Sequence, residues 1–296
     1  MVQDKSTARR IFVCFNYVFL ILLALLCILP MINLLAVSLS SRSAAEAGLV
    51  GLWPVHFTTY AYSWTMQNAE FFQALWVSIQ RVGIAVPIQL FLTITAAYPL
   101  SKERSTFKHR PIFVAYFIIV MVFSGGLIPF FIVVSRVGLI DSIWALILPG
   151  AVNTWHIILM MNFFRGIPKE LEEAAFIDGA SHWRTMAQIY LPISLPSIAT
   201  ITLFIVVGHW NEWFHGIIFM NDPSNYPLQT YLRTRVVTFD PTMITGDREA
   251  IRRMMEVSNR TTNAAQVFIA MIPVLLIYPF LQRYFMSGLT IGSVKG

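Results

Sequence analysis

Two long apolar stretches of the sequence each contain a charged side chain. Arg81 lies near the start of one stretch, and Glu212 lies in the Trp210-Asn211-Glu212-Trp213 run of another. An ionisable group in such a place is costly, which makes it a candidate for function. Aromatic faces beside amide and carboxylate groups could bind a sugar. A structural Arg–Glu pair, or an Arg81 side chain that reaches the membrane interface, would explain the same residues.

Other arrangements that perform chemistry are missing from the sequence. None of the five lysines follows a glycine, so the chain has no GxxxxGK[ST] loop to bind the phosphates of ATP. It contains no HExxH or CxxC motif, and His109, His182 and His209 lack the spacing of metal ligands. We therefore expect no enzyme activity, no metal and no cofactor bound by this chain.

The composition predicts a membrane protein. Of the 296 residues, 56% are hydrophobic and only 12% are charged, whereas soluble domains are about one-quarter charged. This excludes a disordered chain, a coiled coil and almost any water-soluble enzyme. The net charge of +6 does not indicate nucleic-acid binding, because the basic residues gather in a few short loops, as topology signals do.

Six apolar windows are long enough to cross a lipid bilayer as helices, so the predicted fold is an all-α, polytopic membrane protein. The first window is too long for the apolar region of a signal peptide, and no clear small-x-small cleavage site follows it, so we expect a retained helix. The windows cover about 11–37, 75–100, 112–135, 143–164, 197–220 and 264–286.

The distribution of Lys and Arg predicts the orientation of these spans. Twelve basic residues lie in the two tails and the loops 101–111 and 165–196, against two, Arg42 and Arg136, in the short loops of the other side. Both termini are therefore expected in the cytoplasm. The outer loop 221–263 is too long for a simple turn, so we expect it to fold in part or to contact another molecule.

The segment 166–192 has the pattern of a polar helical hairpin. Pro168 suits a first helical position, acidic residues follow in the first turns, and Gly179 suits a helix end. Ser181 can cap a second helix, which Pro192 would end. Such a hairpin is too polar to cross the bilayer and amphipathic enough to need a partner surface. Packing under its own helices, or lying at the lipid interface, remains an alternative.

This segment resembles the EAA signature of bacterial ABC-importer permeases. The matching residues are Glu173, Ala174, Ala175, Gly179, Ile189, Leu191 and Pro192. Further segments are similar to carbohydrate-importer permeases of the maltose-transporter type: Leu52-Trp53-Pro54, Ala96–Ser101, Ser124–Pro129, Trp210-Asn211 and Tyr284–Gly288. The resemblance implies a type I ABC-importer permease fold. Its parts would be an N-terminal tail, first span and external segment (1–74), a transmembrane core (75–286) and a cytoplasmic tail (287–296).

The resemblance also implies partners and roles. The hairpin would dock on a dimer of separate ATPase subunits, which use ATP and magnesium. Glu173 would supply the polar contact, Ala174 and Ala175 would allow close approach, and Gly179 would permit the turn. A second related permease, an extracytoplasmic solute-binding protein and an oligosaccharide would complete the system in a bacterial cytoplasmic membrane.

Two further expectations concern gating and cargo. Gly125, Gly126 and Pro129 would permit a kink and close packing in the third span. Arg81, together with six arginines in the loop 221–263, would suit an anionic sugar such as a uronate oligomer, although five acidic residues share that loop.

Two other classes of protein compete with this interpretation. A secondary carrier driven by an ion gradient needs intramembrane acids, and Glu212 alone qualifies. It would also leave the hairpin without a purpose. A membrane-bound enzyme ranks last, because the loops hold no nucleophile–base or metal arrangement.

Overall fold

The computed structural model describes residues 7–237 and 260–292 of the chain. These residues are helical with no strand among them, and the chain divides into two compact units. One unit is formed by Met1–Ala69 with Thr234–Met271, and the other by Glu70–Arg233 with Ile272–Gly296.

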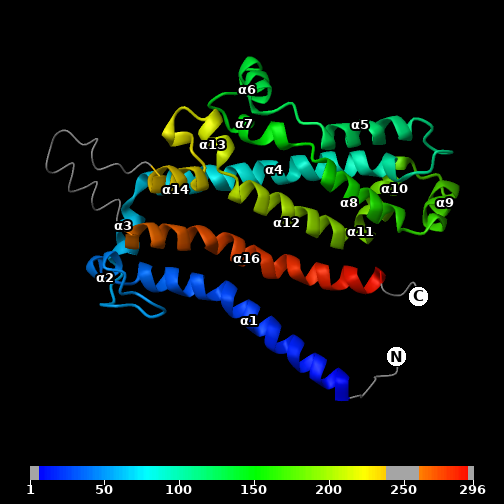
Figure 1. The fold of residues 1–296 in the computed structure, drawn as a ribbon. Helices are drawn as coiled ribbons and strands as arrows, with labels where there is room; N and C mark the ends of the chain where they lie inside the picture. The colour runs from blue at the N-terminus through cyan, green and yellow to red at the C-terminus, as the bar shows by residue number, and fades with distance from the viewer. Residues whose placement is uncertain (1–6, 238–259, 293–296) are drawn as a thin grey trace. The chain divides into compact units, whose positions relative to one another are not determined.

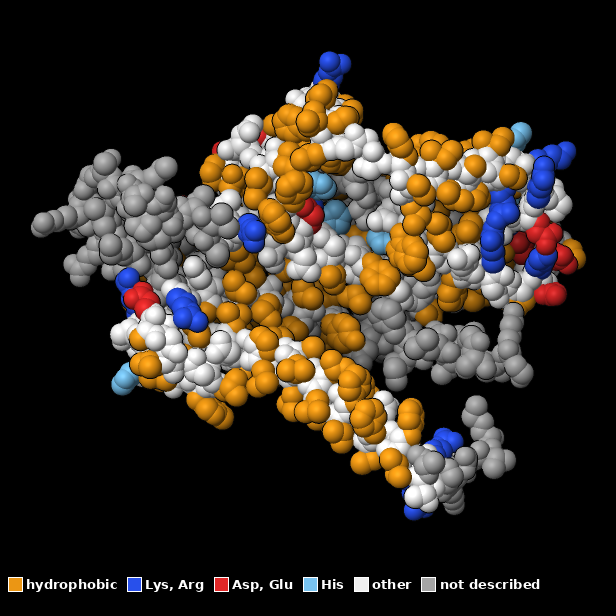
Figure 2. Space-filling model, in the orientation of Figure 1, with side chains coloured by type: hydrophobic (Ala, Val, Ile, Leu, Met, Phe, Trp, Pro, Cys, Tyr) orange, Lys and Arg blue, Asp and Glu red, His pale blue; other side chains and the backbone are white. Residues whose placement is uncertain are grey.

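The first unit contains helix α1 (Thr7–Ser38), the short helices α2 (Arg42–Glu46) and α3 (Tyr60–Gln67), and the start of α16 (Arg260–Gly292). Most of α1 is apolar and exposed, as a lipid-facing helix should be, and Figure 2 shows hydrophobic side chains along the face in view. Its C-terminal end packs through Val37 against Ala45 and Ala264. The long α16 therefore meets the segment 38–68 within this unit.

The second unit begins with the long helix α4 (Ala69–Ser101) (Figure 1). The helices that follow are α5 (Arg110–Val122), α6 (Leu127–Arg136), α7 (Ile143–Ile147), α8 (Thr154–Arg165), α9 (Lys169–Ile177), α10 (His182–Thr185), α11 (Leu191–Ile193), α12 (Leu195–Asn211), α13 (Phe214–Phe219) and α14 (Leu228–Val237). Short turns of other helix types, η1 (Leu148–Gly150), η2 (Met186–Tyr190) and η3 (Pro223–Asn225), lie between them.

Within residues 7–237 and 260–292, three helices are long and apolar enough to span a membrane, and the number rises to six when each of three bent helix pairs is counted as one span. The third, fourth and fifth windows are interrupted, and the kink expected in the third span is present. The third bends by 113° between α5 and α6, and the fourth by 47° between η1 and α8. The fifth ends at Asn211, and α13 follows it as a separate helix. Gly125-Gly126 and Pro149-Gly150 lie at the first two breaks and Glu212-Trp213 at the third, and a hydropathy average does not register them.

The break of the third span occurs at the predicted glycines. Gly126 has φ +84°, a backbone conformation that favours glycine, and it precedes α6. Pro129 lies in the first turn of α6, where a proline is tolerated. The close packing that we expected here was wrong for Gly125 and Gly126, because no atom lies within 4 Å of a Cβ built on either residue. These glycines shape the backbone and leave open space beside it.

Close packing of a glycine occurs instead at Gly216 in α13. A Cβ built there would lie 2.0 Å from Oγ1 of Thr230 in α14. The same Thr230 hydroxyl donates a hydrogen bond of 2.8 Å to the carbonyl oxygen of Trp213. The predicted outer loop 221–263 is therefore partly folded, and its helix α14 is seated on α13.

This contact yields a prediction about stability. Gly216→Ala forces Thr230 to move, and overpacking of this kind destabilises by about 1–3 kcal/mol. We expect a lower melting temperature of the detergent-purified protein, with partial recovery in Gly216→Ala/Thr230→Ala, which removes Oγ1 and Cγ2 of Thr230. The matched control, Gly125→Ala, should leave the melting temperature unchanged because its Cβ meets no neighbour. Equal effects of the two Gly→Ala changes would contradict the packing argument.

Asp141 connects the turn before α7 with the segment before η3. Its Oδ1 atom accepts hydrogen bonds from the backbone N–H groups of Asn221 and Asp222 and from the side-chain amide of Asn225. These bonds, of which that from Asn225 has the largest effect, lower the pKa of the carboxyl group. Asp141 itself has φ 61°, a conformation that aspartate tolerates better than most residues.

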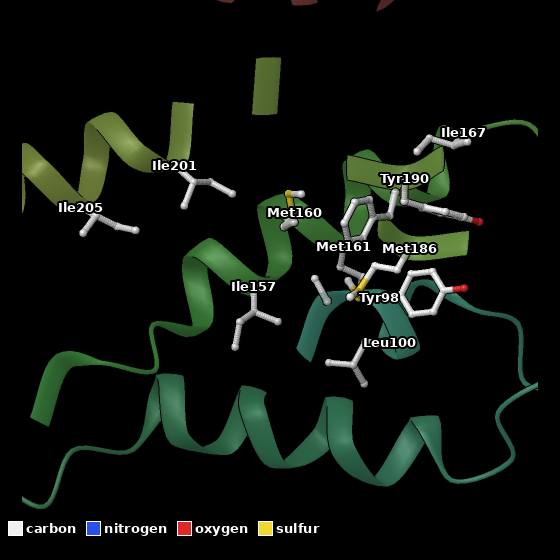
Figure 3. Packing of buried hydrophobic residues seen from close by; sticks show 12 residues of the cluster. Tyr98, Leu100, Ile157, Met160, Met161, Ile167, Met186, Tyr190, Ile201 and Ile205 are labelled. Atoms are coloured by element: carbon white, nitrogen blue, oxygen red, sulfur yellow. The ribbon is translucent and has the colours of Figure 1, made fainter. Parts of the chain in front are cut away.

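The largest described hydrophobic core of the second unit lies where α4, α8 and α12 meet the chain around Met186 and Tyr190 (Figure 3). Tyr98, Phe164 and Tyr190 pack edge to face within it, with ring centroids 5.0–6.3 Å apart. The predicted hairpin packs into this core through Ile167, Met186 and Tyr190.

Candidate functional site

The predicted hairpin is present as two helical arms joined at Gly179. The first arm, α9, ends in a Schellman motif, in which the N–H of Ala180 bonds the carbonyl of Ala175 and that of Gly179 bonds Phe176. Gly179 has φ +77°, the conformation that this motif requires and that glycine adopts without a steric penalty. The sequence therefore located the turn correctly, for a local steric reason.

The second arm begins at Ser181, whose hydroxyl accepts a hydrogen bond from the backbone N–H of Arg184. It continues through α10, the π-helical turn η2 and α11. The chain then bends by 82° before α12. Pro192 and Pro196 flank this bend, in agreement with the predicted break.

The residues of the EAA signature occupy different environments on this hairpin. Glu173, Ala174 and Gly179 are exposed, whereas Ala175 is buried inside the hairpin. Ala175 therefore packs against its own chain and does not offer a surface for close approach. Ile189 and Leu191 are half-buried, and Pro192 is exposed.

The tip of the hairpin carries large apolar side chains that its own chain leaves uncovered. Ile177 is 85% exposed, more than any other large hydrophobic residue in the described part of the chain. Trp183, on the second arm, is 64% exposed. Figure 1 places α9 beyond the ends of α4, α5 and α8, and Figure 2 shows basic and acidic side chains gathered at this end. Exposed apolar groups among charges are typical of a protein-binding surface.

A buried ionic cluster that the sequence analysis missed fastens the hairpin to α4. The Lys102 cluster consists of Lys102, directly after α4, Glu172 in α9 and Tyr190 in η2. The ammonium of Lys102 lies 2.7 Å from Oε1 of Glu172 and donates to the Tyr190 hydroxyl at 2.9 Å. That hydroxyl in turn donates to Oε2 of Glu172 at 2.7 Å. Three segments of the chain thus meet at one buried positive charge.

Aromatic rings surround the same ammonium group. Nζ of Lys102 lies 3.9 Å from the ring centre of Tyr98 and 4.1 Å from that of Tyr190, which are cation–π contacts. Burial lowers the pKa of Lys102, while Glu172 acts in the opposite direction. The sequence offered two signals, a lysine directly after an apolar span and an extra acid before the EAA signature. It did not show that these two residues pair.

A second ion pair joins the same two segments at the surface. Lys169, at the start of α9, pairs with Glu103, and both side chains are more than 60% exposed. The hydrogen bond from Lys169 is the main cause that lowers the pKa of Glu103. Exposed pairs of this kind contribute little to stability.

Arg81 and Glu212 come together as the sequence analysis suggested. Nη2 of Arg81 lies 2.9 Å from Oε2 of Glu212, and Nη1 donates to the Glu212 carbonyl oxygen at 3.1 Å. Arg81 also donates to the Leu146 carbonyl oxygen and to Nδ1 of His209. The guanidinium therefore links α4 with α7 and with the end of α12.

Glu212 occupies the break between α12 and α13. Its Oε1 atom accepts a hydrogen bond of 2.8 Å from the backbone N–H of His215, in the first turn of α13. The end of α12 is further tied to α4 through Gln89, whose side-chain amide lies 2.7 Å from Nε2 of His209. The carboxylate thus stabilises a discontinuous helix as well as balancing the charge of Arg81.

The residues predicted to contact the cargo, Arg81 and Trp210-Asn211-Glu212-Trp213, fall into two groups by their burial. Arg81 is only 1% exposed and Trp210 only 5%, so neither presents a surface to a cargo molecule. Asn211 is exposed, the Glu212 side chain is 25% exposed, and Trp213 is 37% exposed. The Arg233 guanidinium lies 4.9 Å from the centre of the Trp213 ring. A direct cargo contact therefore remains a prediction for the partly exposed group alone.

No group of His, Cys, Asp and Glu side chains within residues 7–237 and 260–292 could hold a metal ion. The expected arginines beyond position 237 lie outside the described residues, except Arg260, which donates to the carbonyl oxygen of Ala45. The predicted cytoplasmic tail 287–296 begins inside α16, which continues to Gly292.

Comparisons with known proteins agree with this geometry. Residues 105–291 match the family described as "Binding-protein-dependent transport system inner membrane component". Protein LplC of Bacillus subtilis (strain 168) is 39% identical over 99% of this chain and 98% of its own length. The polygalacturonan/rhamnogalacturonan transport system permease protein YtcP of the same organism is 38% identical over 97% of this chain and 99% of its own.

A solved structure is similar over nearly the whole chain. It is that of a bacterial ABC transporter involved in the import of the acidic polysaccharide alginate. The TM-score is 0.85 at 31% sequence identity, and the alignment covers 96% of this chain and 100% of the other. The broken spans described above thus occur in a fold that is already known from a transporter.

Proposed function

The chain belongs to the family of binding-protein-dependent transport system inner membrane components, and we propose that, as a permease subunit of an ABC importer, it moves an acidic oligosaccharide. The family and the alginate-importer fold establish the carbohydrate ABC-permease class. The cargo, the partners and the orientation in the membrane are the proposed part.

Energy would come from a dimer of separate ATPase subunits that dock on the hairpin tip. The observation that carries this proposal is the exposure of Ile177 and Trp183 beside Glu173 and Ala174 on a polar hairpin. A hairpin that only packed under its own helices would cover such side chains. The chain has no phosphate-binding loop of its own, so ATP and magnesium would be bound by that partner.

The remaining partners follow from the family. Its description names dependence on a binding protein, and we infer that an extracytoplasmic protein delivers the oligosaccharide to this chain. We also infer a second, related permease as the other half of the pathway. Both termini would lie in the cytoplasm of a bacterium, in keeping with the positive-inside distribution of Lys and Arg.

The charge of the cargo is supported by two relatives and by one feature of the chain. YtcP is named for polygalacturonan and rhamnogalacturonan, and the similar solved transporter for acidic alginate. In this chain, Arg233 lies against Trp213 in the partly exposed group. Glu212, the acid that an ion-gradient carrier would need, is already bound by Arg81, which disfavours that alternative.

Uptake by the complete transporter tests the proposed cargo. Proteoliposomes that contain both permeases and the ATPase, supplied with the binding protein and internal ATP, are expected to take up trigalacturonate at least about tenfold faster than a neutral galactose trisaccharide. Tenfold corresponds to about 1.4 kcal/mol, which one additional charge contact could supply. Equal uptake of the two sugars would contradict an acidic cargo, and uptake that persists without ATP would contradict the importer.

A further inference from the structure

We propose that the Lys102 cluster is the positioning element that passes movement of the hairpin to α4, so that ATP hydrolysis and transport stay coupled. This inference rests on the proposed function, since it assumes an ATPase that moves the hairpin. It assigns a role to Lys102, Glu172 and Tyr190, none of which belongs to the EAA signature.

The geometry distinguishes this cluster from an ordinary surface contact. Lys102 contacts both arms of the hairpin, through Glu172 in α9 and Tyr190 in η2, at 2.7 and 2.9 Å. The third side of the triangle, between Tyr190 and Glu172, is closed by a hydrogen bond of 2.7 Å. Because the side chains of Lys102 and Glu172 are only 8% and 13% exposed, breaking the contact leaves a buried charge unpaired. The arms and the end of α4 are therefore expected to move together.

The other contacts of α4 explain why its movement matters. The helix is continuous from Ala69 to Ser101, and Arg81 lies about 30 Å from Lys102 at 1.5 Å per residue. At that distance Arg81 bonds Leu146 and Glu212, and between the two sites Gln89 bonds the Gly150 carbonyl. A shift of α4 at the hairpin end would thus reach the breaks at η1 and between α12 and α13. These breaks are positions where the helices can change direction.

The chain supplies a matched control one residue away. Glu103 also pairs with the hairpin, through Lys169, but both side chains are exposed. An exposed pair is screened by water and holds the two segments only weakly. If any ionic contact between the loop 101–111 and the hairpin were enough for coupling, Glu103 would be as important as Lys102.

The decisive measurement is the ratio of sugar transported to ATP hydrolysed in proteoliposomes that contain the complete transporter and binding protein. The main variant is Lys102→Met/Glu172→Gln, which removes both buried charges and keeps the side-chain volumes, so that assembly is preserved. We expect this ratio to fall about five- to tenfold while binding-protein-stimulated ATP hydrolysis continues, as for the loss of a coupling interaction. Glu103→Gln is expected to change the ratio less than about twofold.

A conservative variant separates coupling from mere stability. Lys102→Arg keeps the charge, and the cavity of about 320 Å³ that Lys102 lines with Trp183 and Phe107 has room for the larger side chain. We expect its ratio to stay within about twofold of the wild type, because a guanidinium can still pair with Glu172 and lie against the tyrosine rings. An unchanged ratio in the assembled double variant, or an equal fall in Lys102→Arg, would overturn the inference. Failure of the proposed function would look different, because the wild-type complex itself would then show no stimulated ATP hydrolysis or uptake.

Discussion

Arg81→Met is expected to lower the free energy of unfolding by about 3 kcal/mol, the lower end of the cost of breaking a buried ion pair, because the Glu212 carboxylate left behind is partly exposed. Arg81 is 1% exposed and donates four hydrogen bonds to Leu146, His209 and Glu212. Its loss leaves the Glu212 carboxylate and two carbonyl oxygens without these donors. The measurement is the melting temperature of the detergent-purified protein, together with the yield of assembled complex.

The double variant Arg81→Met/Glu212→Gln is the control for this prediction. Removing both charges is expected to recover more than half of the lost stability, because no unpaired ion remains. If the double variant were as unstable as Arg81→Met, the ion pair would not be the source of the effect. Glu212→Gln separately tests the cargo hypothesis, since unchanged uptake with normal assembly would exclude a direct role of this partly exposed carboxylate.

Ile177→Glu is expected to weaken capture of the ATPase subunits by about 10- to 100-fold without affecting the fold of the permease. Ile177 is 85% exposed at the hairpin tip, so its own chain gains little from it. An apolar anchor buried at an interface contributes about 1.5–3 kcal/mol, which corresponds to this range of affinity. Co-purification of the ATPase with the tagged permease, over a series of ATPase concentrations, measures the change.

Val137→Glu provides the matched control for the hairpin tip. Val137 is another highly exposed aliphatic residue, in the turn after α6 that is predicted to face the outside. The Val137→Glu permease is expected to bind the ATPase with the affinity of the wild type and to have the same melting temperature. Loss of capture in Val137→Glu, or normal capture in Ile177→Glu, would place the ATPase elsewhere on the chain.

Local signals explain which parts of the site were predictable. Gly179 needs a positive φ, Ser181 caps the next helix, and Pro192 interrupts it, and each of these effects acts over only a few residues. The hairpin could therefore be located to within one residue or so. Its EAA signature could be recognised for the same reason, because the defined positions lie within 20 residues of sequence.

The breaks in the spans were harder to predict from the sequence. The sequence indicated a kink only in the third span, at Gly125-Gly126, because a hydropathy window averages over Pro149-Gly150 and over Glu212. Close packing at Gly216 was also missed, because it depends on Thr230, which lies on a separate helix. An isolated glycine does not reveal whether it shapes the backbone or admits a neighbour.

The sequence by itself determined the membrane character, the approximate positions of the spans, the hairpin and the family, because these follow from composition and short-range spacing. Only the tertiary structure decided which charges meet. Arg81 and Glu212 are 131 residues apart, and Lys102 finds Glu172 and Tyr190 across 70 and 88 residues. Ion pairing depends on distance in space and on exclusion of water, and the packing of α4 against the following helices sets both.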